Sequence, residues 1–361
     1  MVNAGRRWLC GGLIACCVLL GGCEDAAGPK GASANKAAEA TMVRGRTMGT
    51  FYSITVPGGF PGGEEALKKL ADEKLNTIVS AISTFDPKAE LARFNAHDDV
   101  TPFPISPLLA GLIEESLHQS KRIDGAMDIT IGPLVNLWGF GKDHPRKVPG
   151  DYELDAARRL VGADKFELRH TPNEPLLVKR ERGVKLDLAT IGEGAGADAI
   201  AAALDRLGVR DYLVSVAGAS RSRGHNPRGE LWKIGIEDPT TPDGHVFTTI
   251  CPLDQAVSTA GSYRNFFIDE KTGRHYSHII DPHTGRPVEH QTLSVTVVDR
   301  AALVTDALDT GLLVWGADKA HAWAERHDMA IYTIEYRDGR PHGRASRAFN
   351  QYQRCTQGGN P

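Results

Sequence analysis

The sequence predicts an α+β fold, in which strands and helices occur in separate runs of the chain. Strand-like segments come in clusters, without the regular strand–helix alternation that a doubly wound parallel sheet requires. About 320 residues follow an N-terminal leader, which is ample for one large core. They contain no linker-like break and no repeat. We therefore expect one elaborated domain over residues 42–350 and a short C-terminal tail over residues 351–361.

Hydrophobic periodicity places the elements along this domain. The first strand alternates over residues 50–56, and the first helix repeats apolar residues from Leu67 to Ile82. A second helix opens with a cap at Ser106 and a proline at its first position, and ends before Gly125. A third spans about residues 195–207 and stops at Gly208. Further strands are expected over residues 211–216, 232–236, 293–298 and 330–335.

The first 22 residues have the pattern of a bacterial lipoprotein signal. Two arginines precede a short apolar run over residues 13–20, too short to span a membrane as a stable helix. Small residues then lead to Cys23, which predicts lipidation at Cys23. An ordinary secretory signal cut nearby is the alternative. Residues 23–41 lack a hydrophobic period and are typical of a flexible tether. The pattern predicts the periplasmic side of a bacterial membrane and favours the inner membrane.

Composition excludes several classes of function. The net charge is −3 and the basic residues are scattered, so no nucleic-acid partner is expected. No later segment resembles a membrane span. Cys251 and Cys355 remain besides Cys23 once the leader is removed, and they form no zinc-binding pattern. They could pair in an oxidising compartment, but the sequence leaves this open.

One segment near the C-terminus carries the clearest chemical signal. Residues 303–313 are nearly all apolar, yet Asp306, Asp309 and Thr310 stand at i, i+3 and i+4, on one side of a helix. Buried carboxylates cost free energy unless they are compensated. A hard cation such as Mg²⁺, which prefers oxygen ligands, would compensate them. Solvated or capping aspartates at a helix start are the alternative.

Two further segments carry weaker signals. Residues 185–198 predict a strand-like start, a glycine-rich turn and an alanine-rich helix, which could receive a phosphate. Their spacing fits neither a dinucleotide fingerprint nor a Walker loop, so a plain strand–turn–helix is equally compatible. Residues 276–287 place His278 beside two isoleucines, ahead of turn-forming residues. His278 is therefore either a structural or a catalytic histidine. The small-residue stretch 258–264 is either a ligand loop or a tight turn.

Seven segments, taken in order, resemble the ApbE family of FAD:protein FMN transferases from about Arg46 to about Tyr336. They are residues 47–50, 83–85, 124–135, 186–188, 258–264, 277–282 and 306–310. The resemblance implies a single T-fold-like domain with a mixed, largely antiparallel sheet and packed helices. It implies an enzyme that binds FAD and Mg²⁺ and transfers the FMN half of FAD to a threonine hydroxyl of a target protein, releasing AMP.

The resemblance also assigns residues. The metal would be held by Asp306, Asp309, Thr310 and a group of Thr190. His278 would assist catalysis as a base, and Asp281 would orient it. The flavin nucleotide would contact Met48, Phe85, Ala126, Met127, Asp128, Asp187, Glu193 and Ile280. Four positions depart from the common family pattern: Glu193 replaces a lysine, Ala195 an aromatic residue, Ala217 a glycine and Ala260 a serine.

The implied partner is a flavoprotein subunit of a membrane redox complex that carries a Ser/Thr-Gly-Ala-Thr motif. This chain lacks that motif, so it is expected to modify other proteins and not itself. Two other functions would use the same binding residues. One is a lipid-anchored FAD carrier. The other is a Mg²⁺-dependent FAD pyrophosphatase, in which water replaces the threonine hydroxyl.

Overall fold

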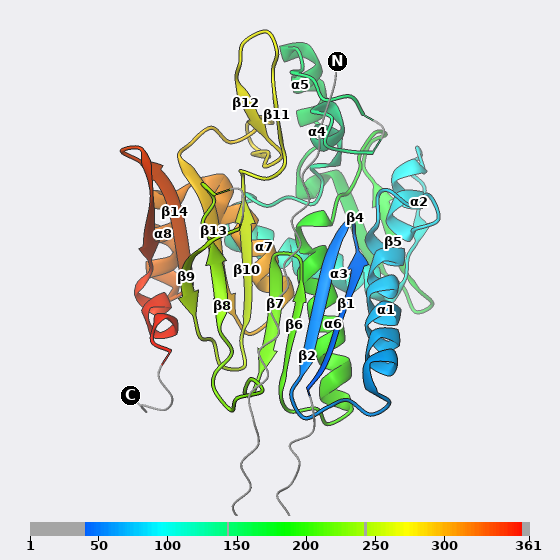
Figure 1. The fold of residues 1–361 in the computed structure, drawn as a ribbon. Coiled ribbons are helices and arrows are strands. Elements are labelled where there is room, and N and C mark those ends of the chain that lie inside the picture. Colours follow the sequence, from blue (N-terminus) through cyan, green and yellow to red (C-terminus); the bar gives the residue numbers. More distant parts are fainter. Residues whose placement is uncertain (1–39, 143, 242–243, 356–361) are drawn as a thin grey trace, which may run out of the picture. The chain divides into compact units, whose positions relative to one another are not determined.

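The computed structural model describes residues 40–142, 144–241 and 244–355. Within these residues an eight-stranded sheet has the order β1-β2-β6-β7-β10-β13-β14-β15, and each neighbouring pair is antiparallel (Figure 1). The strands are β1 (Thr41–Thr47), β2 (Thr50–Val56), β6 (Tyr212–Val216), β7 (Ala219–Arg223), β10 (Ala256–Gly261), β13 (Thr292–Asp299), β14 (Ala330–Arg337) and β15 (Arg340–Ala345). The predicted α+β class with a largely antiparallel sheet is confirmed.

Helices pack against this sheet and against one another. The neighbours α6 and α7 contact β7, α1 contacts β1, α8 contacts β14, and α3 packs on α7. Figure 1 shows α6 and α7 side by side behind the strands. These helices are α1 (Gly63–Ile82), α3 (Pro107–Arg122), α6 (Ala189–Arg206), α7 (Ala302–Trp315) and α8 (Ala317–His327). The arrangement leaves α7 between the sheet and α3, which explains why its sequence is almost wholly apolar.

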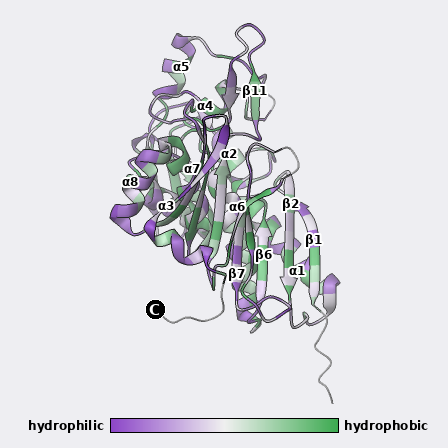
Figure 2. Ribbon diagram, turned by 60° about the vertical axis from the view of Figure 1, so that its left-hand side comes forward, coloured by the Kyte–Doolittle hydropathy of each residue, from purple (hydrophilic) through white to green (hydrophobic). Residues whose placement is uncertain are grey.

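The main core lies between the sheet and these helices. Val295 and Val297 of β13 pack with Leu308 and Leu312 of α7, and each of the four is fully buried. Hydrophobic colouring accordingly concentrates on the strands and on α7, whereas α5 and α8 are largely hydrophilic (Figure 2). Burial of this apolar surface is the dominant favourable term in folding.

A smaller lobe has its own hydrophobic cluster. It contains α4 (Gly132–Leu137), α5 (Asp151–Arg158) and the hairpin of β11 (Phe266–Ile268) and β12 (His275–Ser277), which lie close together in Figure 1. Trp138 and Tyr276 pack together in this cluster, with ring centroids 5.3 Å apart. The indole of Trp138 also donates a hydrogen bond to the Gly285 carbonyl at 2.8 Å. The segment that carries His278 is thereby fixed against α4.

The remaining elements are short. They are α2 (Glu90–Ala96), the three-stranded sheet of β3 (Phe103–Pro104), β5 (Pro175–Lys179) and β4 (Phe166–His170), the hairpin of β8 (Ile234–Glu237) and β9 (Val246–Ile250), and the 3₁₀ helices η1 (Ala163–Lys165) and η2 (Arg347–Gln353).

Most predicted elements are found, with one substantial correction. The Ser106 hydroxyl accepts a hydrogen bond from the Leu109 amide at 3.2 Å and caps α3 as expected. The helix expected from residue 195 instead begins at Ala189, so the glycine-rich run lies inside α6 and not in a turn. The residues before it form no strand. The expected strand 232–236 is found two residues later, as β8.

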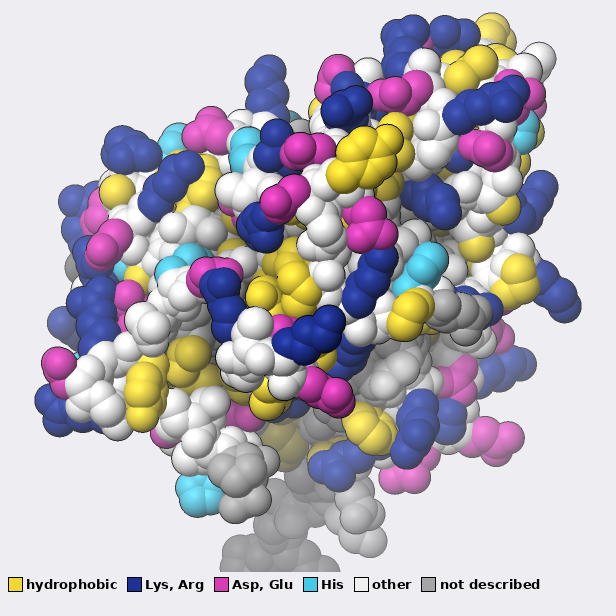
Figure 3. Space-filling view, turned by 90° about the horizontal axis from the view of Figure 1, so that it is seen from above, with side chains coloured by type: hydrophobic (Ala, Val, Ile, Leu, Met, Phe, Trp, Pro, Cys, Tyr) yellow, Lys and Arg dark blue, Asp and Glu magenta, His cyan; other side chains and the backbone are white. Residues whose placement is uncertain are grey.

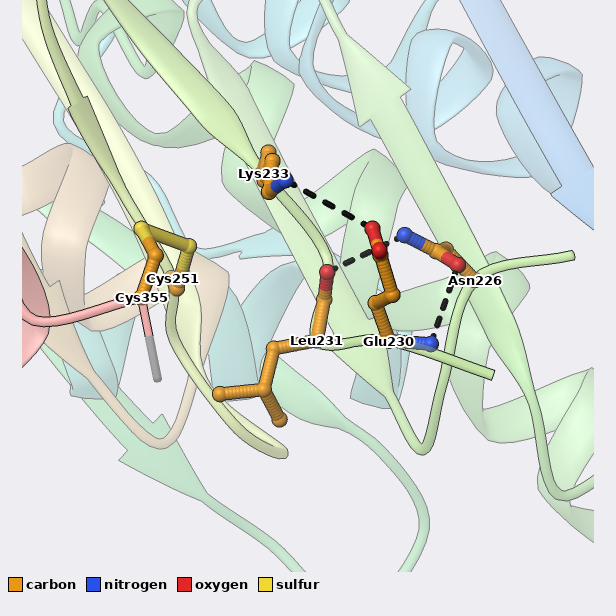
Figure 4. The surroundings of a disulfide bond; sticks show 6 residues. All are labelled: Asn226, Glu230, Leu231, Lys233, Cys251 and Cys355. Atoms are coloured by element: carbon orange, nitrogen blue, oxygen red, sulfur yellow. Dashed lines mark hydrogen bonds and ion pairs between the residues drawn. A yellow bond between two sulfur atoms is a disulfide. The ribbon is translucent and has the colours of Figure 1, made fainter. Parts of the chain in front are cut away.

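The pairing that the sequence left open is formed. Cys251 and Cys355 make a disulfide across 104 residues of sequence, with their α-carbons 5.2 Å apart (Figure 4). The Cys251 amide also donates to the Tyr352 carbonyl at 2.8 Å. The last described residues are therefore attached to the segment that follows β9.

The predicted leader over residues 1–22, the lipidation site Cys23 and nearly all of the tether lie outside the described residues, as does the tail beyond residue 355. None of the described helices is long and apolar enough to cross a bilayer.

Candidate functional site

A cavity of about 1450 Å³ opens between the main sheet, α6, α7 and the lobe. Small-molecule pockets typically measure about 300–1,000 Å³, so this cavity has room for a large ligand. Twelve of the fourteen residues assigned from the sequence line it: Phe85, Ala126, Met127, Asp128, Asp187, Thr190, Glu193, His278, Ile280, Asp306, Asp309 and Thr310. Residues from position 85 to position 310 of the sequence are thus brought to one site.

Two carboxylates of α7 form the deepest acidic part of this cavity. Asp306 is 7% exposed and Asp309 is 1% exposed, so the alternative of solvated aspartates is wrong. The Asp306 carboxylate accepts hydrogen bonds from the Gly194 amide at 2.7 Å and the Ser258 hydroxyl at 3.4 Å. Thr310 Oγ1 lies 3.2 Å from Asp309 Oδ1. The helical spacing read from the sequence therefore gathers three oxygen-bearing side chains at one place.

Burial makes these carboxylates difficult to ionise. It raises the pKa of Asp306 well above the ordinary value, and the nearby charges of Asp309 and Glu193 raise it further. Burial likewise raises the pKa of Asp309. Burial also raises the pKa of Glu193, whose carboxylate accepts a hydrogen bond from the Gly218 amide at 2.9 Å. A cation is the group that such a cluster of buried acids lacks.

The donor set fits a magnesium ion. Carboxylate and hydroxyl oxygens suit this hard cation, which usually keeps several waters and binds through one or two carboxylates plus substrate phosphates. The described residues contain no group of three His, Cys, Asp or Glu side chains placed to hold a metal by themselves. Two aspartates and two threonines would supply only part of the coordination of Mg²⁺, and substrate oxygens and water would have to supply the rest.

Glycines set the spacing between α6 and α7. A β-carbon at Gly194 would lie 2.2 Å from the carbonyl oxygen of Ala302. Asp198 of α6 accepts hydrogen bonds from the first amides of α7, those of Ala302 at 3.0 Å and Leu303 at 2.9 Å. The glycine-rich run thus allows α6 and α7 to pack closely. From the sequence, a phosphate-binding turn was one interpretation of this run.

The residues assigned to the flavin nucleotide surround the rest of the cavity. Phe85 is 57% exposed at its margin, whereas Ala126 and Met127 are buried. Asp128 accepts from the Thr130 amide and hydroxyl, at 2.8 and 2.6 Å, and burial raises its pKa. Asp187 accepts from the Ala189 amide at 2.8 Å, at the start of α6, and burial raises its pKa also.

Two assigned residues are not among those that line the cavity. Met48 occupies the two-residue turn between β1 and β2 with φ of 50°, and its sulfur lies next to Gly192 of α6. Asp281 accepts a hydrogen bond from the His283 amide at 2.9 Å within its own turn. The structure therefore brings Asp281 to His283, whereas the Nδ1 atom of His278 contacts the Asn265 carbonyl at 3.0 Å.

Basic side chains lie at the exposed margin of the cavity. Arg44, Lys142 and Arg264 line it and are exposed, in contrast to the buried acids at its base. Figure 3 shows Lys and Arg side chains mixed with Asp, Glu and hydrophobic side chains on the face seen from above, and Arg264 is paired with Glu237. Such a margin attracts anions, including phosphates.

Sequence reasoning missed Asn95, which also lines the cavity. Its side-chain amide donates to the Leu186 carbonyl at 2.7 Å and its side-chain carbonyl accepts from the Leu186 amide at 2.8 Å. This pair of bonds holds the segment that carries Asp187. No local signal could have revealed it, because the partners are 91 residues apart in sequence.

The chain is similar to known proteins over most of its length. The model of the ApbE family matches residues 48–333. The FAD:protein FMN transferase of Escherichia coli (strain K12) is 38% identical over 323 residues, 89% of this chain and 91% of the relative. That of Vibrio cholerae serotype O1 is 36% identical over 351 residues, 96% of this chain and 99% of the relative.

Solved structures are similar to this chain as well. The flavin transferase ApbE from Vibrio cholerae has a TM-score of 0.78 at 36% identity, covering 87% of this chain and 99% of that one. The apo form of the Pseudomonas stutzeri flavinyl transferase ApbE has a TM-score of 0.78 at 32% identity, covering 87% of this chain and 97% of that one.

Proposed function

The chain belongs to the ApbE family and is an enzyme that transfers FMN from FAD to a protein, and we propose that the acceptor is a threonine hydroxyl, that Mg²⁺ is required and that AMP is released. The observation that carries the proposal is the placement of Asp306, Asp309 and His278 in one large cavity. Buried acids suit a metal-bound pyrophosphate, and a histidine suits an incoming hydroxyl.

The reaction is a phosphoryl-group transfer. The threonine oxygen attacks the phosphorus on the FMN side of the pyrophosphate and forms a phosphoester bond. The bond from that phosphorus to the bridging oxygen breaks, and AMP leaves with the electron pair. The hydroxyl proton passes to His278. The Nδ1 atom of this histidine donates a hydrogen bond to a carbonyl, so Nε2 is the atom that accepts the proton.

Protein groups hold the substrates in place. Asp306, Asp309, Thr310 and Thr190 would hold Mg²⁺, which when bound would neutralise charge on the pyrophosphate. The exposed cations Arg44, Lys142 and Arg264 attract the same phosphates. Glu193 stands where relatives with lysine would offer another cation, so this chain depends more on metal and backbone donors.

The test uses the full-length chain in detergent, with FAD, Mg²⁺ and an acceptor domain that carries the Ser/Thr-Gly-Ala-Thr motif. We expect a covalent FMN mass shift on the acceptor and one AMP released per FMN attached. EDTA should abolish both, and an acceptor with valine in place of the threonine should gain no FMN. Transfer that persists in EDTA would contradict the metal requirement.

The same assay separates the other two functions. FAD that stays bound and intact with every acceptor would indicate a carrier. Steady release of free FMN and AMP without an acceptor would indicate a pyrophosphatase, in which water replaces the threonine.

We also propose that the enzyme is anchored by a lipid at Cys23 on the periplasmic side of a bacterial membrane and that its partners are redox complexes of that membrane. The leader sequence supports this, and the Cys251–Cys355 disulfide fits an oxidising compartment. Cys23→Ala should abolish the fatty-acyl mass and membrane fractionation. A mature N-terminus other than Cys23 would refute the anchor.

A further inference from the structure

The proton acceptor of the proposed reaction is held by a neighbouring loop. Asn265, between β10 and β11, offers its backbone carbonyl to both the amide and the Nδ1 atom of His278, at 2.9 and 3.0 Å. A carbonyl oxygen can only accept, so Nδ1 carries the proton in neutral His278 and the lone pair lies on Nε2. The position of one peptide group thus decides which nitrogen can act as a base.

Arg146 contacts the groups on either side of that peptide group. Its guanidinium donates to the Asn265 side-chain carbonyl at 2.9 Å and to the Phe266 backbone carbonyl at 2.6 Å. The peptide bond between these two residues contains the carbonyl that His278 contacts. The two-pronged contact uses the fixed fork geometry of arginine, which lysine cannot reproduce.

The same guanidinium is linked to His278 by a second route. It lies over the Phe140 ring, 5.4 Å from the centroid, and this ring meets the His278 ring edge-on with centroids 6.3 Å apart. Burial lowers the pKa of His278, and the positive charge of Arg146 lowers it further. Arg146 comes from the loop between α4 and α5, whereas His278 follows β12, and these parts of the lobe lie close together in Figure 1.

We propose, on the basis of the proposed function, that Arg146 is a positioning residue that clamps the Asn265–Phe266 peptide and so keeps His278 in the Nδ1–H form. Arg146 is exposed, so its contribution to folding stability is small. Its effect should appear in the rate of transfer and in the state of the histidine, and not in the unfolding temperature.

The test compares Arg146→Met, Arg146→Lys and a matched control, Lys147→Met, in the full-length chain. Lys147 is the next residue, is also exposed, and pairs with Glu153 at 2.6 Å, away from His278. We expect Arg146→Met to lower kcat for transfer about 10–100-fold, a part of what a general base contributes. FAD affinity should stay within about threefold. Arg146→Lys keeps the positive charge but loses the two-pronged geometry, so its kcat should lie between those of Arg146→Met and the parent. The kcat of Lys147→Met should match that of the parent.

Nitrogen-15 NMR of histidine-labelled protein, with the signal assigned through His278→Gln, reads the tautomer without turnover. The parent should show the Nδ1–H tautomer of His278, and Arg146→Met should show a mixture of the Nδ1–H and Nε2–H tautomers. A parent-like kcat in Arg146→Met, an unchanged tautomer, or an equal loss of FAD affinity would each overturn the proposal. If the parent itself transfers no FMN, the proposed function fails, and the tautomer comparison still decides whether Arg146 is a clamp.

Discussion

At the scale of single residues, the two aspartates of α7 are suited to a metal and unfavourable for the fold without one. Burial raises the pKa of Asp306, and the neighbouring charges of Asp309 and Glu193 raise it further. Selection for stability alone would not retain such a cluster, because burying a charge costs free energy unless the charge is paired.

Asp309→Asn should therefore separate stability from activity. Transfer should fall at least about a hundredfold, because one hard ligand is lost. The unfolding temperature in EDTA should rise, because a buried carboxylate is removed. Mg²⁺ should raise the unfolding temperature of the parent more than that of the variant. Calorimetry and the transfer assay measure both, with Asp318→Asn, an exposed carboxylate on α8, as the control. Full activity in Asp309→Asn would contradict the assignment.

His278 predicts the pH dependence of transfer. Burial holds its pKa below the ordinary 6.5, so the neutral, proton-accepting form dominates at pH 7. With saturating Mg²⁺, kcat should fall as the solution becomes more acid, and the midpoint of that fall should lie below pH 6.5. His278→Gln should lose at least about a hundredfold in kcat while FAD affinity stays within about tenfold. An acid limb centred above pH 6.5 in the parent would contradict this.

At the scale of elements, the site depends on how α6 and α7 meet. Asp198 satisfies two amides at the start of α7 that have no partner within the helix, and so acts as an N-cap supplied by another helix. Asp306 lies one turn further along α7, so the position of the cap and the position of the carboxylate are linked.

Asp198→Ala should cost about 1–2 kcal/mol of unfolding free energy, the upper range for a lost N-cap. It should also weaken Mg²⁺ binding, because the first turn of α7 frays. Asp198→Asn retains one accepting oxygen and should give intermediate values of both. Urea denaturation and a Mg²⁺ titration measure the two effects. An Asp198→Ala protein as stable as the parent would show that the cap contributes nothing.

The same elements show what the sequence can and cannot predict. The α7 cluster was predictable because Asp306, Asp309 and Thr310 stand at i, i+3 and i+4 and so share one helix face. The glycine run was misread as a turn, because local preference favours turns while tertiary packing against Ala302 places it in a helix. The contacts of Asn95 and Arg146 join residues far apart in sequence, and no local pattern encodes them.

At the scale of the whole molecule, the disulfide closes a loop of about a hundred residues that includes β10, β13 and α7. Neither cysteine lines the cavity. The crosslink should therefore stabilise the fold without taking part in catalysis.

Cys355→Ser should lower the free energy of unfolding by about 2–4 kcal/mol, the typical contribution of a disulfide. The rate of FMN transfer at 25 °C should stay close to that of the parent. Urea denaturation with and without reductant measures the first effect, and reduced parent should match the variant. A large loss of activity in folded Cys355→Ser would show that the crosslink shapes the site.

The glycines of α6 also constrain how this protein can change during evolution. At Gly194 a side chain would meet the backbone oxygen of Ala302, which no substitution elsewhere can remove. At Gly192 and Gly196 it would meet the flexible ends of Ile82 and Leu75, which can move or be exchanged. An alignment of relatives should therefore show glycine alone at position 194. At positions 192 and 196 other small residues should also occur, and they should covary with the residues at positions 82 and 75, respectively.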